Sequence, residues 1–356
     1  MSGNRILGFP SAGETRVLVL SMVLWLAVTA MFVGLRPEHI FLGILIACMF
    51  EAAPASRRLV VALLPFIVFG ISYDWMNIVH NYDVNPVDIA GLNAAERSLF
   101  GINAGGSVLT PNEFFALHTN RVLDILGGVF YLCWVPVPIA FGLWLYFRHR
   151  ESEYLHFSLV FLFVNFIGFA GYYIHPAAPP WYVAKYGFDF IAGTPGDVAG
   201  LGGFDEFTGL GIFNGLYGRN SNVFAAVPSL HSAYTLVAFI YSLRGRNPLW
   251  IRIALGVITL GIWFTAVYTS HHYLIDVLLG IGCALLGFVL FEYVLMRIPA
   301  FARFISAYAR YISGEEAPEV EGYESVRVVA WSMGVWAASG LRAQGIKIGS
   351  TTGYTR

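Results

Sequence analysis

The stretch AAVPSLHSAY, residues 225–234, decides the fold, because it joins a polar loop to a long apolar run. Pro228 and Ser229 stand where the run begins, and serine is one of the residues that favour a helix start. With this group as its first turn, the run through residue 243 is long enough to cross a membrane. An ionisable side chain at membrane depth is costly and indicates function, so His231 needs a partner or a chemical role.

The composition is that of an integral membrane protein. Of the 356 residues, 57% are hydrophobic and 12% are charged, whereas a soluble domain carries roughly 25% charged residues. The net charge of −1 identifies no partner. Cys48, Cys133 and Cys283 lie inside apolar runs without pairing or metal-ligand spacing, which predicts small core residues and no disulfides.

Eight segments are apolar over a length that suits a membrane span, since a bilayer core of about 30 Å takes roughly 20 helical residues. They cover residues 17–35, 39–54, 59–79, 122–147, 155–174, 226–243, 250–269 and 273–296. The second is short, and the sixth is long enough only with the Pro-Ser-Leu-His group. The sequence therefore predicts an all-α, polytopic membrane helical bundle of about eight transmembrane helices.

Positive charge sets the expected orientation, because Lys and Arg stay on the cytoplasmic side. Alternate links carry the arginines, at positions 57, 58, 148, 150, 244, 246 and 252, whereas the other short links carry Arg36 or none. Both termini are therefore expected in the cytoplasm. The two long outward connections, residues 80–121 and 175–227, are rich in aromatic residues, Gly and Pro and predict short interfacial helices.

Four regions follow from this scheme. They are an N-terminal transmembrane module (1–80), an extracytoplasmic interfacial segment (81–121), a helical core (122–298) and a cytoplasmic tail (299–356). Within the tail, the stretch VRVVAWSMGVWAA is too short to span a bilayer.

Three polar clusters fall at the outer ends of the expected spans: YYIHPAAPPWY (172–182), PSLH (228–231) and YTSHHYLID (268–276). His272 and Asp276 are four residues apart and share one face of a helix. A carboxylate on one imidazole nitrogen fixes the tautomer and leaves the other nitrogen as a nucleophile or base. His231 lies at the same membrane face, so we expect the two histidines to meet.

The PSLH and HHYLID motifs resemble the second and third signature motifs of the type 2 phosphatidic acid phosphatase superfamily. There, Pro-Ser-Gly-His supplies one histidine, and His-x-x-x-Asp supplies the second histidine and the carboxylate. Leu230, the doubled His271-His272 and HPAAPPW (175–181) resemble one branch, the inositol phosphorylceramide synthases and their bacterial relatives. LFGIN (99–103) and Asp124 are similar to the N-terminal half of that branch, so the resemblance covers about residues 73–290.

The resemblance implies a role for each motif residue. His272 attacks phosphorus and becomes a phosphohistidine, Asp276 orients it, and His231 protonates the leaving alkoxide and then activates the acceptor. Phosphate binding, aided by N–H groups at a helix start, is expected from Ser229, Leu230, His271 and Arg219. The substrate pocket is expected to include His175, Pro180, Trp181 and Lys185. No metal or cofactor is implied.

The chain departs from the phosphatase pattern at its cationic positions. The first motif of the superfamily has Lys, six residues, then Arg-Pro; here Gly168 takes the Lys position and His175 the Arg position. Thr265-Ala266 replaces the Ser-Arg that precedes the third motif. A phosphodiester brings one negative charge and a phosphomonoester nearly two, so fewer cations favour a diester. Replacement charge is expected from Arg219, Lys185, His175 and His271.

The resemblance, together with the missing cations, implies a membrane phosphotransferase that moves phosphoinositol from phosphatidylinositol onto a ceramide-like lipid and releases diacylglycerol. Its partners would be those two lipids and the bilayer, with no nucleic acid, and its site would face the extracytoplasmic or lumenal side. The alternative is a lipid phosphate phosphatase acting on phosphatidate or a polyprenyl diphosphate. A non-enzymatic transporter or scaffold, a structural role for the histidines and a zinc site are further alternatives; Ser229 beside the histidine motif favours phosphate over zinc.

Overall fold

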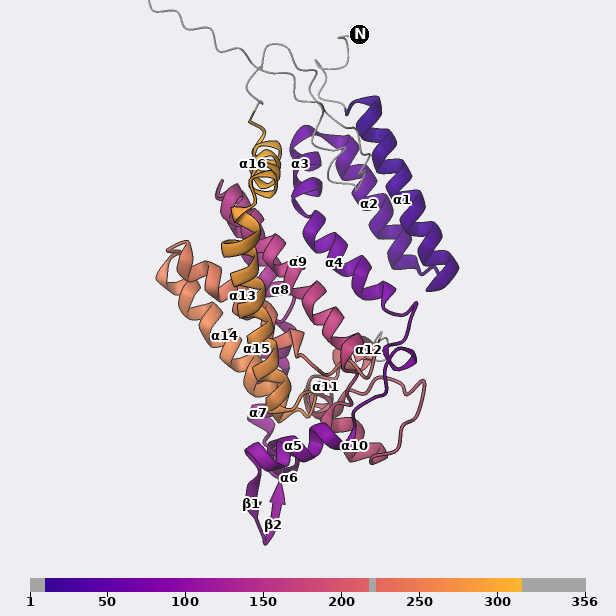
Figure 1. Cartoon of the computed structure of the whole chain (residues 1–356), viewed down its shortest axis with the longest axis vertical. Helices are drawn as coiled ribbons and strands as arrows, with labels where there is room; N and C mark the ends of the chain where they lie inside the picture. The colour runs from indigo at the N-terminus through magenta and orange to yellow at the C-terminus, as the bar shows by residue number, and fades with distance from the viewer. Residues whose placement is uncertain (1–9, 218–221, 316–356) are drawn as a thin grey trace, which may run out of the picture.

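Helices aligned with the long axis of the molecule form most of the structure (Figure 1). The structure is a computed structural model, and it describes residues 10–217 and 222–315. The helices of the bundle are α1 (Ala12–Phe32), α2 (Pro37–Ala52), α3 (Pro54–Ala62), α4 (Leu64–Trp75), α7 (Arg121–Leu132), α8 (Pro136–Phe147), α9 (Glu151–Ile174), α13 (Leu230–Arg244), α14 (Leu249–Tyr268), α15 (Leu274–Val289) and α16 (Pro299–Ser313). The mostly helical fold expected from the sequence is confirmed.

Within residues 10–217 and 222–315, four helices are long and apolar enough to cross a membrane. They are α1, α9, α14 and α15, the last continuing through a π-helix (η4, Leu290–Val294) and a 3₁₀ turn (η5, Leu295–Arg297). Counting each bent pair as one span, α3 with α4 and α7 with α8, raises the number to six. Helices α2 and α13 have 16 and 15 residues, fewer than the roughly 20 that a span needs.

Two of the expected spans are broken by proline. The axis turns by 50° between α3 and α4 and by 45° between α7 and α8. Pro65 lies in the first turn of α4 and Pro136 begins α8. A proline inside a helix removes one backbone hydrogen bond and clashes with the preceding turn, so each continuous apolar segment becomes two helices.

Helix α9 lies at the centre of the bundle and packs against α4, α8, α13 and α15. Its contact face is aromatic: Phe157 and Phe161 are fully buried. The ring of Phe161 lies 4.7 Å from that of Tyr234 on α13 and 5.4 Å from that of Phe69 on α4. Aromatic pairs at such distances add to the energy of burial, and here they fix the neighbours of the histidine-bearing α13.

The α1–α2 pair lies beside α4, at the edge of the bundle (Figure 1). Trp75 donates its indole N–H to the hydroxyl of Thr29 at 3.0 Å. Asp74 pairs with Arg36 and with His39. Leu20 and Phe41 expose 62% and 69% of their surfaces, as expected for side chains that face lipid.

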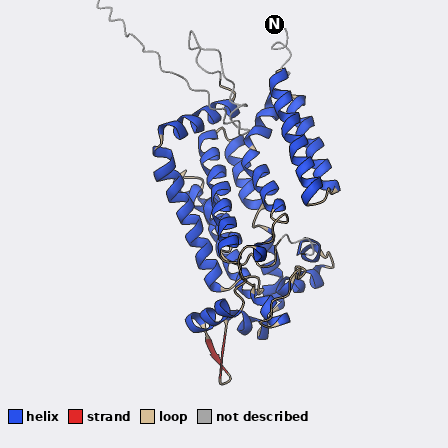
Figure 2. Cartoon of the chain, turned by 45° about the vertical axis from the view of Figure 1, so that its right-hand side comes forward, coloured by secondary structure: helices blue, strands red, loops and turns tan. Residues whose placement is uncertain are grey.

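Short elements collect at one end of the bundle (Figure 2); we call this the loop-rich end. They are η2 (Asn81–Asp83), α5 (Ala90–Phe100), β1 (Ile102–Ala104), β2 (Ser107–Leu109), α6 (Pro111–Leu117), α10 (Pro180–Tyr186), η3 (Ala199–Leu201), α11 (Gly202–Thr208) and α12 (Ile212–Tyr217). The short helices predicted for the two long connections are therefore confirmed.

The β1–β2 hairpin was not predicted. The strands pair antiparallel, with Ile102 opposite Leu109. Gly105 and Gly106, which form the turn, both have positive φ, and a two-residue hairpin turn of this kind requires that conformation. The Gly-Gly pair was thus a hairpin signal inside a segment expected to be helical. The tail stretch VRVVAWSMGVWAA and the rest of residues 316–356 lie outside the described residues.

Candidate active site

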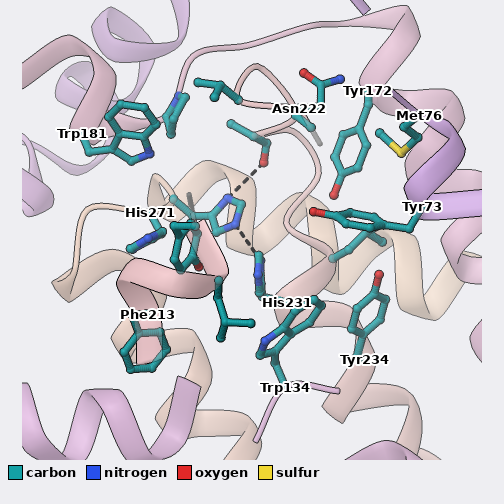
Figure 3. Close-up of a pocket in the computed structure, with 18 residues that line it drawn as sticks. Tyr73, Met76, Trp134, Tyr172, Trp181, Phe213, Asn222, His231, Tyr234 and His271 are labelled. Carbon is teal, nitrogen blue, oxygen red and sulfur yellow. Dashed lines mark hydrogen bonds between the residues drawn. The ribbon is translucent and has the colours of Figure 1, made fainter. Parts of the chain in front are cut away.

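A cavity of about 210 Å³ opens at the loop-rich end, and all three predicted polar clusters contribute to its wall. His231, His271 and His272 line it together, and Figure 3 labels the first two. The rest of the described wall is mainly aromatic and aliphatic: Tyr73, Met76, Trp134, Tyr172, Pro179, Trp181, Phe213, Leu216, Tyr217, Asn222, Val223, Ala225, Ala226, Leu230 and Tyr234. A largely apolar pocket with a few converging polar groups is the usual form of a small-molecule or lipid site.

His231 and His272 are in direct contact. Nδ1 of His231 lies 3.0 Å from Nε2 of His272, and Figure 3 draws this bond. The other nitrogen of His272, Nδ1, lies 3.1 Å from the carbonyl oxygen of Ala226 and 3.5 Å from Oδ2 of Asp276. Because a carbonyl only accepts, Nδ1 carries the proton, and the lone pair of His272 is on Nε2. Nδ1 of His231 is then the donor to that lone pair.

The same geometry bears on the zinc alternative. His231 and Asp276 contact opposite nitrogens of the His272 ring. Three ligands of one zinc ion must converge on a single point about 2 Å from each donor atom. Contacts on opposite sides of one ring do not converge in this way. They instead orient the His272 ring, so that Asp276 faces Nδ1 while Nε2 keeps the lone pair that a nucleophile needs.

Backbone contacts between α13 and α15 hold the two motifs together. The N–H of Ser229 donates to the carbonyl of Asp276 at 3.0 Å. The helices approach closely because residue 280 is glycine: a Cβ at this position would lie 2.1 Å from the carbonyl oxygen of Ser229. The start of α13, which carries His231, is thereby fixed against the first turn of α15, which carries Asp276.

The imidazole of His231 packs against two aromatic rings that the motifs did not reveal. The ring of Tyr131 lies 4.9 Å away and nearly parallel, and the ring of Trp134 lies 4.6 Å away. Tyr131 is on α7, and Trp134 lies in the break before α8. The clue in the sequence was the pair Pro136 and Pro138 in the middle of a predicted span, since the broken helix places Trp134 against the histidine.

His271 lies against the cavity as a neutral group. Its Nδ1 is 3.1 Å from the hydroxyl of Thr269, and its ring lies 4.4 Å from that of Tyr217. Burial, and next the electrostatic interaction with His272, lower the pKa of His271 to about 3. A neutral imidazole is able to form hydrogen bonds with a phosphate oxygen, but it supplies no fixed positive charge.

The other residues expected to bind phosphate are placed unevenly. Leu230 lines the cavity. Ser229 is fully buried, its hydroxyl accepts from Ser232 at 3.1 Å, and it is absent from the described cavity wall. Its N–H is also engaged, as described above, so Ser229 ties two helices together in this structure. Arg219 lies outside the described residues.

The expected pocket residues divide in the same way. The side chain of Trp181 lines the cavity, and its backbone N–H donates to the backbone carbonyl of Ser270 at 3.1 Å. Pro180 is buried at the start of α10, behind the described wall. The side chain of His175 is 51% exposed and lies 3.4 Å from Asp88. Pro179 is the N-cap and Pro180 the first residue of α10, the short helix that places Trp181 at the cavity.

Lys185 does not line the described cavity. Its ammonium group pairs with Asp197 at 2.6 Å, and its side chain is 53% exposed. That hydrogen bond raises the pKa of Lys185. Among the residues described, the cavity wall contains no Lys or Arg. The replacement cations expected from Lys185 and His175 are thus not brought to the histidine pair.

The structure gives a physical reason for one departure from the phosphatase pattern. A Cβ on Gly168 would lie 2.5 Å from Cδ2 of Leu230. Leucine at position 230 therefore fills the space that any side chain at position 168 would enter. The replacement of Gly by Leu in PSLH and the replacement of Lys by Gly168 are two parts of one packing arrangement.

Together, the fold and the site define a helical membrane protein with a largely buried centre of two histidines and one carboxylate. The chain belongs to the PAP2 superfamily, whose family model matches residues 105–290. The match includes His231, His272 and Asp276, and it confirms the resemblance drawn from the PSLH and HHYLID motifs.

Curated relatives place the chain within that superfamily. It is 57% identical over 303 residues to a phosphoinositol dihydroceramide synthase of Bacteroides thetaiotaomicron, over 85% of this chain and 99% of the relative. It is 27% identical over 248 residues to the inositol phosphorylceramide synthase catalytic subunit AUR1 of Saccharomyces cerevisiae, over 67% of this chain and 57% of the yeast protein. The inositol phosphorylceramide synthase of Candida albicans is 28% identical over 215 residues, 58% of this chain and 42% of the relative. No solved structure matches the chain.

Proposed function

We propose that the chain transfers phosphoinositol from phosphatidylinositol to the primary hydroxyl of a ceramide-like lipid and releases diacylglycerol. The observation that carries the proposal is the 57% identity to a phosphoinositol dihydroceramide synthase over 99% of that relative's length. The fungal relatives are named for the same kind of product. The histidine pair beside an apolar cavity supports the proposal, because the cavity is suited to a lipid and the pair to phosphoryl transfer.

In the first step, the phosphodiester enters between His231 and His272 and replaces the hydrogen bond between them. Nε2 of His272 forms a bond to phosphorus, and the bond from phosphorus to the diacylglycerol oxygen breaks. His231 enters this step as an imidazolium, which the negative phosphodiester stabilises, and gives its Nδ1 proton to the leaving oxygen. The products are diacylglycerol, neutral His231 and a phosphoinositol group on His272, whose positive ring faces Asp276 at 3.5 Å.

In the second step, neutral His231 takes the proton of the acceptor hydroxyl. The acceptor oxygen forms a bond to phosphorus, and the bond from phosphorus to Nε2 of His272 breaks. His231 is again an imidazolium and His272 is again neutral, so the cycle closes without a net change in the protein. An alcohol competes with water in this step, and the aromatic wall of Tyr73, Trp134 and Tyr234 favours a lipid alcohol because it excludes water.

The charge of the site favours a phosphodiester over a monoester. The described cavity wall holds three histidines and neither Lys nor Arg. A single imidazolium at His231 balances the one negative charge of a diester, whereas a phosphomonoester carries nearly two. The buried charge of a monoester would thus be left partly unpaired, at a high desolvation cost.

The proposal includes the orientation and organisation expected from the sequence: eight crossings, both termini in the cytoplasm and a site that faces the extracytoplasmic or lumenal side. Arg150 and Arg244 support it, because they lie in links at the end of the bundle away from the cavity, where positive charge marks the cytoplasm. The functional regions are then the N-terminal module (1–80), the interfacial segment (81–121), the catalytic core (122–298) and the tail (299–356).

The test supplies purified protein with phosphatidylinositol labelled in the inositol ring, with and without dihydroceramide. A labelled phosphoinositol-ceramide lipid that requires the acceptor is the expected product, and the H272A variant is expected to form none. Release of phosphate from phosphatidate or a polyprenyl diphosphate, without transfer, would establish the phosphatase alternative instead. Omitting the acceptor and mapping the label to His272 by mass spectrometry tests the covalent intermediate.

A further inference from the structure

We propose that Glu96, on the interfacial helix α5, is a positioning residue that holds His272 and Asp276 in their reactive arrangement. Its effect on turnover rests on the proposed function, whereas its effect on local structure does not. Glu96 lies outside the matched range of the family model, 105–290, and it touches none of the reacting groups described above. It acts through the first turn of α15.

The carboxylate of Glu96 caps α15. Oε1 accepts from the N–H of Leu274 at 2.9 Å, and Oε2 accepts from the N–H of Ile275 at 3.1 Å. Glu96 is fully buried. A carboxylate that accepts two N–H groups at a helix start gains both from charge-assisted hydrogen bonds and from the helix dipole, so this contact is strong in its buried setting.

The residues of α15 itself cap only part of its first turn, because the N-cap residue Tyr273 makes no side-chain capping bond. Asp276, three residues on, accepts from the N–H of Tyr273 at 2.9 Å through Oδ2. The same oxygen lies 3.5 Å from Nδ1 of His272. The orientation of the catalytic carboxylate therefore depends on an intact first turn, and Glu96 accepts from two further N–H groups of that turn.

Two asparagines fix the same segment from the same side. Asn112, on α6, donates its side-chain N–H groups to the carbonyls of Val267 and His272, at 2.8 and 2.9 Å. Asn93, one turn before Glu96 on α5, donates to the hydroxyl of Tyr273 at 3.0 Å. All three side chains are buried. Side chains of α5 and α6 thus form hydrogen bonds with four consecutive residues of the HHYLID motif, His272 to Ile275.

The test compares the E96Q, E96D and E96A variants with the full-length wild type in detergent. In E96Q the side chain keeps its volume, but its NH₂ group faces one of the two N–H donors. Because a misplacement of about 1 Å in a catalytic group costs up to about a hundredfold, kcat is expected to fall by at least tenfold in E96Q and E96A. KM should stay within twofold, and E96D should recover part of kcat because it retains the charge.

A matched control is available on α1. Glu14 accepts from the N–H of Ser11 at 2.7 Å and takes part in the cap of a helix that lies outside the site. The E14Q variant is expected to keep the wild-type kcat. If E96Q also keeps kcat within twofold, or if KM alone rises, the positioning role is overturned.

Hydrogen–deuterium exchange gives a readout that does not need turnover. The amides of Leu274 and Ile275 are expected to exchange at least tenfold faster in E96Q than in the wild type, while α9 and α14 keep their protection. Unchanged exchange at these two amides would overturn the cap. If the wild type forms no phosphoinositol-ceramide, the proposed function fails, and the exchange experiment still decides the role of Glu96.

Discussion

The contact between α13 and α15 at Gly280 sets the separation of the two histidines, so the G280A variant tests the site most directly. Adding a methyl group places a Cβ 2.1 Å from the carbonyl oxygen of Ser229. Real Cβ atoms essentially never approach closer than 3.0 Å, so the two backbones must separate by at least about 0.9 Å. The obstructing atom belongs to the backbone and is unable to rotate away, as a flexible side chain would.

The consequence for the chemistry follows from the distances. Ser229 is two residues before His231, whose Nδ1 lies 3.0 Å from Nε2 of His272. A shift of 0.9 Å along that line leaves about 4 Å between the nitrogens, which is beyond hydrogen-bond distance. Misplacing a catalytic group by about 1 Å costs up to roughly a hundredfold in rate, or ~2.7 kcal/mol of activation free energy. We therefore expect kcat of G280A to be ten- to a hundredfold below the wild type.

The assay measures transfer of phosphoinositol to a fluorescent dihydroceramide at saturating lipid. Gly282, on the same helix, is the matched control, because a Cβ there meets no atom within 4 Å. Both substitutions raise helix propensity by about 1 kcal/mol, so a slower G280A enzyme would not reflect a weaker α15. If G280A keeps kcat within twofold of G282A, the two helix backbones do not set the catalytic distance and the reasoning is refuted.

Three further predictions follow from other contacts. His271 has a pKa of about 3 in the folded protein and 6.5 in the unfolded chain, so below pH 7 the unfolded chain binds a proton that the folded protein does not. The free energy of unfolding should therefore fall by ~2 kcal/mol between pH 7 and pH 5. The melting temperature of H271N should fall less over that range than that of the wild type, and an equal fall would contradict the buried neutral state. The G168A variant should lower kcat several-fold, because the new methyl group displaces Leu230. The double variant G168A/L230A should recover part of the lost kcat, and no recovery would show that the two positions are not coupled by packing. Since Lys185 pairs with Asp197 and does not line the described cavity, K185A should transfer phosphoinositol within twofold of the wild type. A large rise in KM would instead place the ammonium on the substrate.

The sequence predicted the long helices well because their apolar length is a property of each segment alone. It also predicted that His231 and His272 meet, since each histidine stands at the same end of its own helix. It did not predict the bend before α8, because the hydropathy of residues 122–147 is continuous and outweighed the signal of Pro136. The aromatic packing of His231 by Tyr131 and Trp134 depends on that bend and was therefore missed with it.

The cationic residues show a different limit. A lysine in a loop beside a motif is a reasonable phosphate ligand on spacing alone, but its direction depends on which carboxylate lies nearby. Lys185 meets Asp197, and His175 meets Asp88. Neither acid belongs to a motif, and Asp88 is 87 residues from His175 along the chain. Pairing over such distances is decided by the packing of the loop-rich end, which a single sequence does not encode in any local pattern.

The bonds that hold the site together are largely bonds to the backbone. Ser229 donates to the carbonyl of Asp276, Asn112 to the carbonyl of His272, and Glu96 accepts from the N–H groups of Leu274 and Ile275. A backbone group is the same in every residue, so these contacts leave no trace in the motif that they support. Their visible sign in the sequence is a weak cap: α15 begins at Leu274 after the N-cap residue Tyr273, which makes no side-chain capping bond, and Asp276 accepts only from the N–H of Tyr273. The other buried N–H groups at the helix start still require acceptors. A helix whose own residues satisfy only part of its first turn therefore indicates that a distant segment supplies the other acceptors, and in this chain that segment is helix α5, through Glu96.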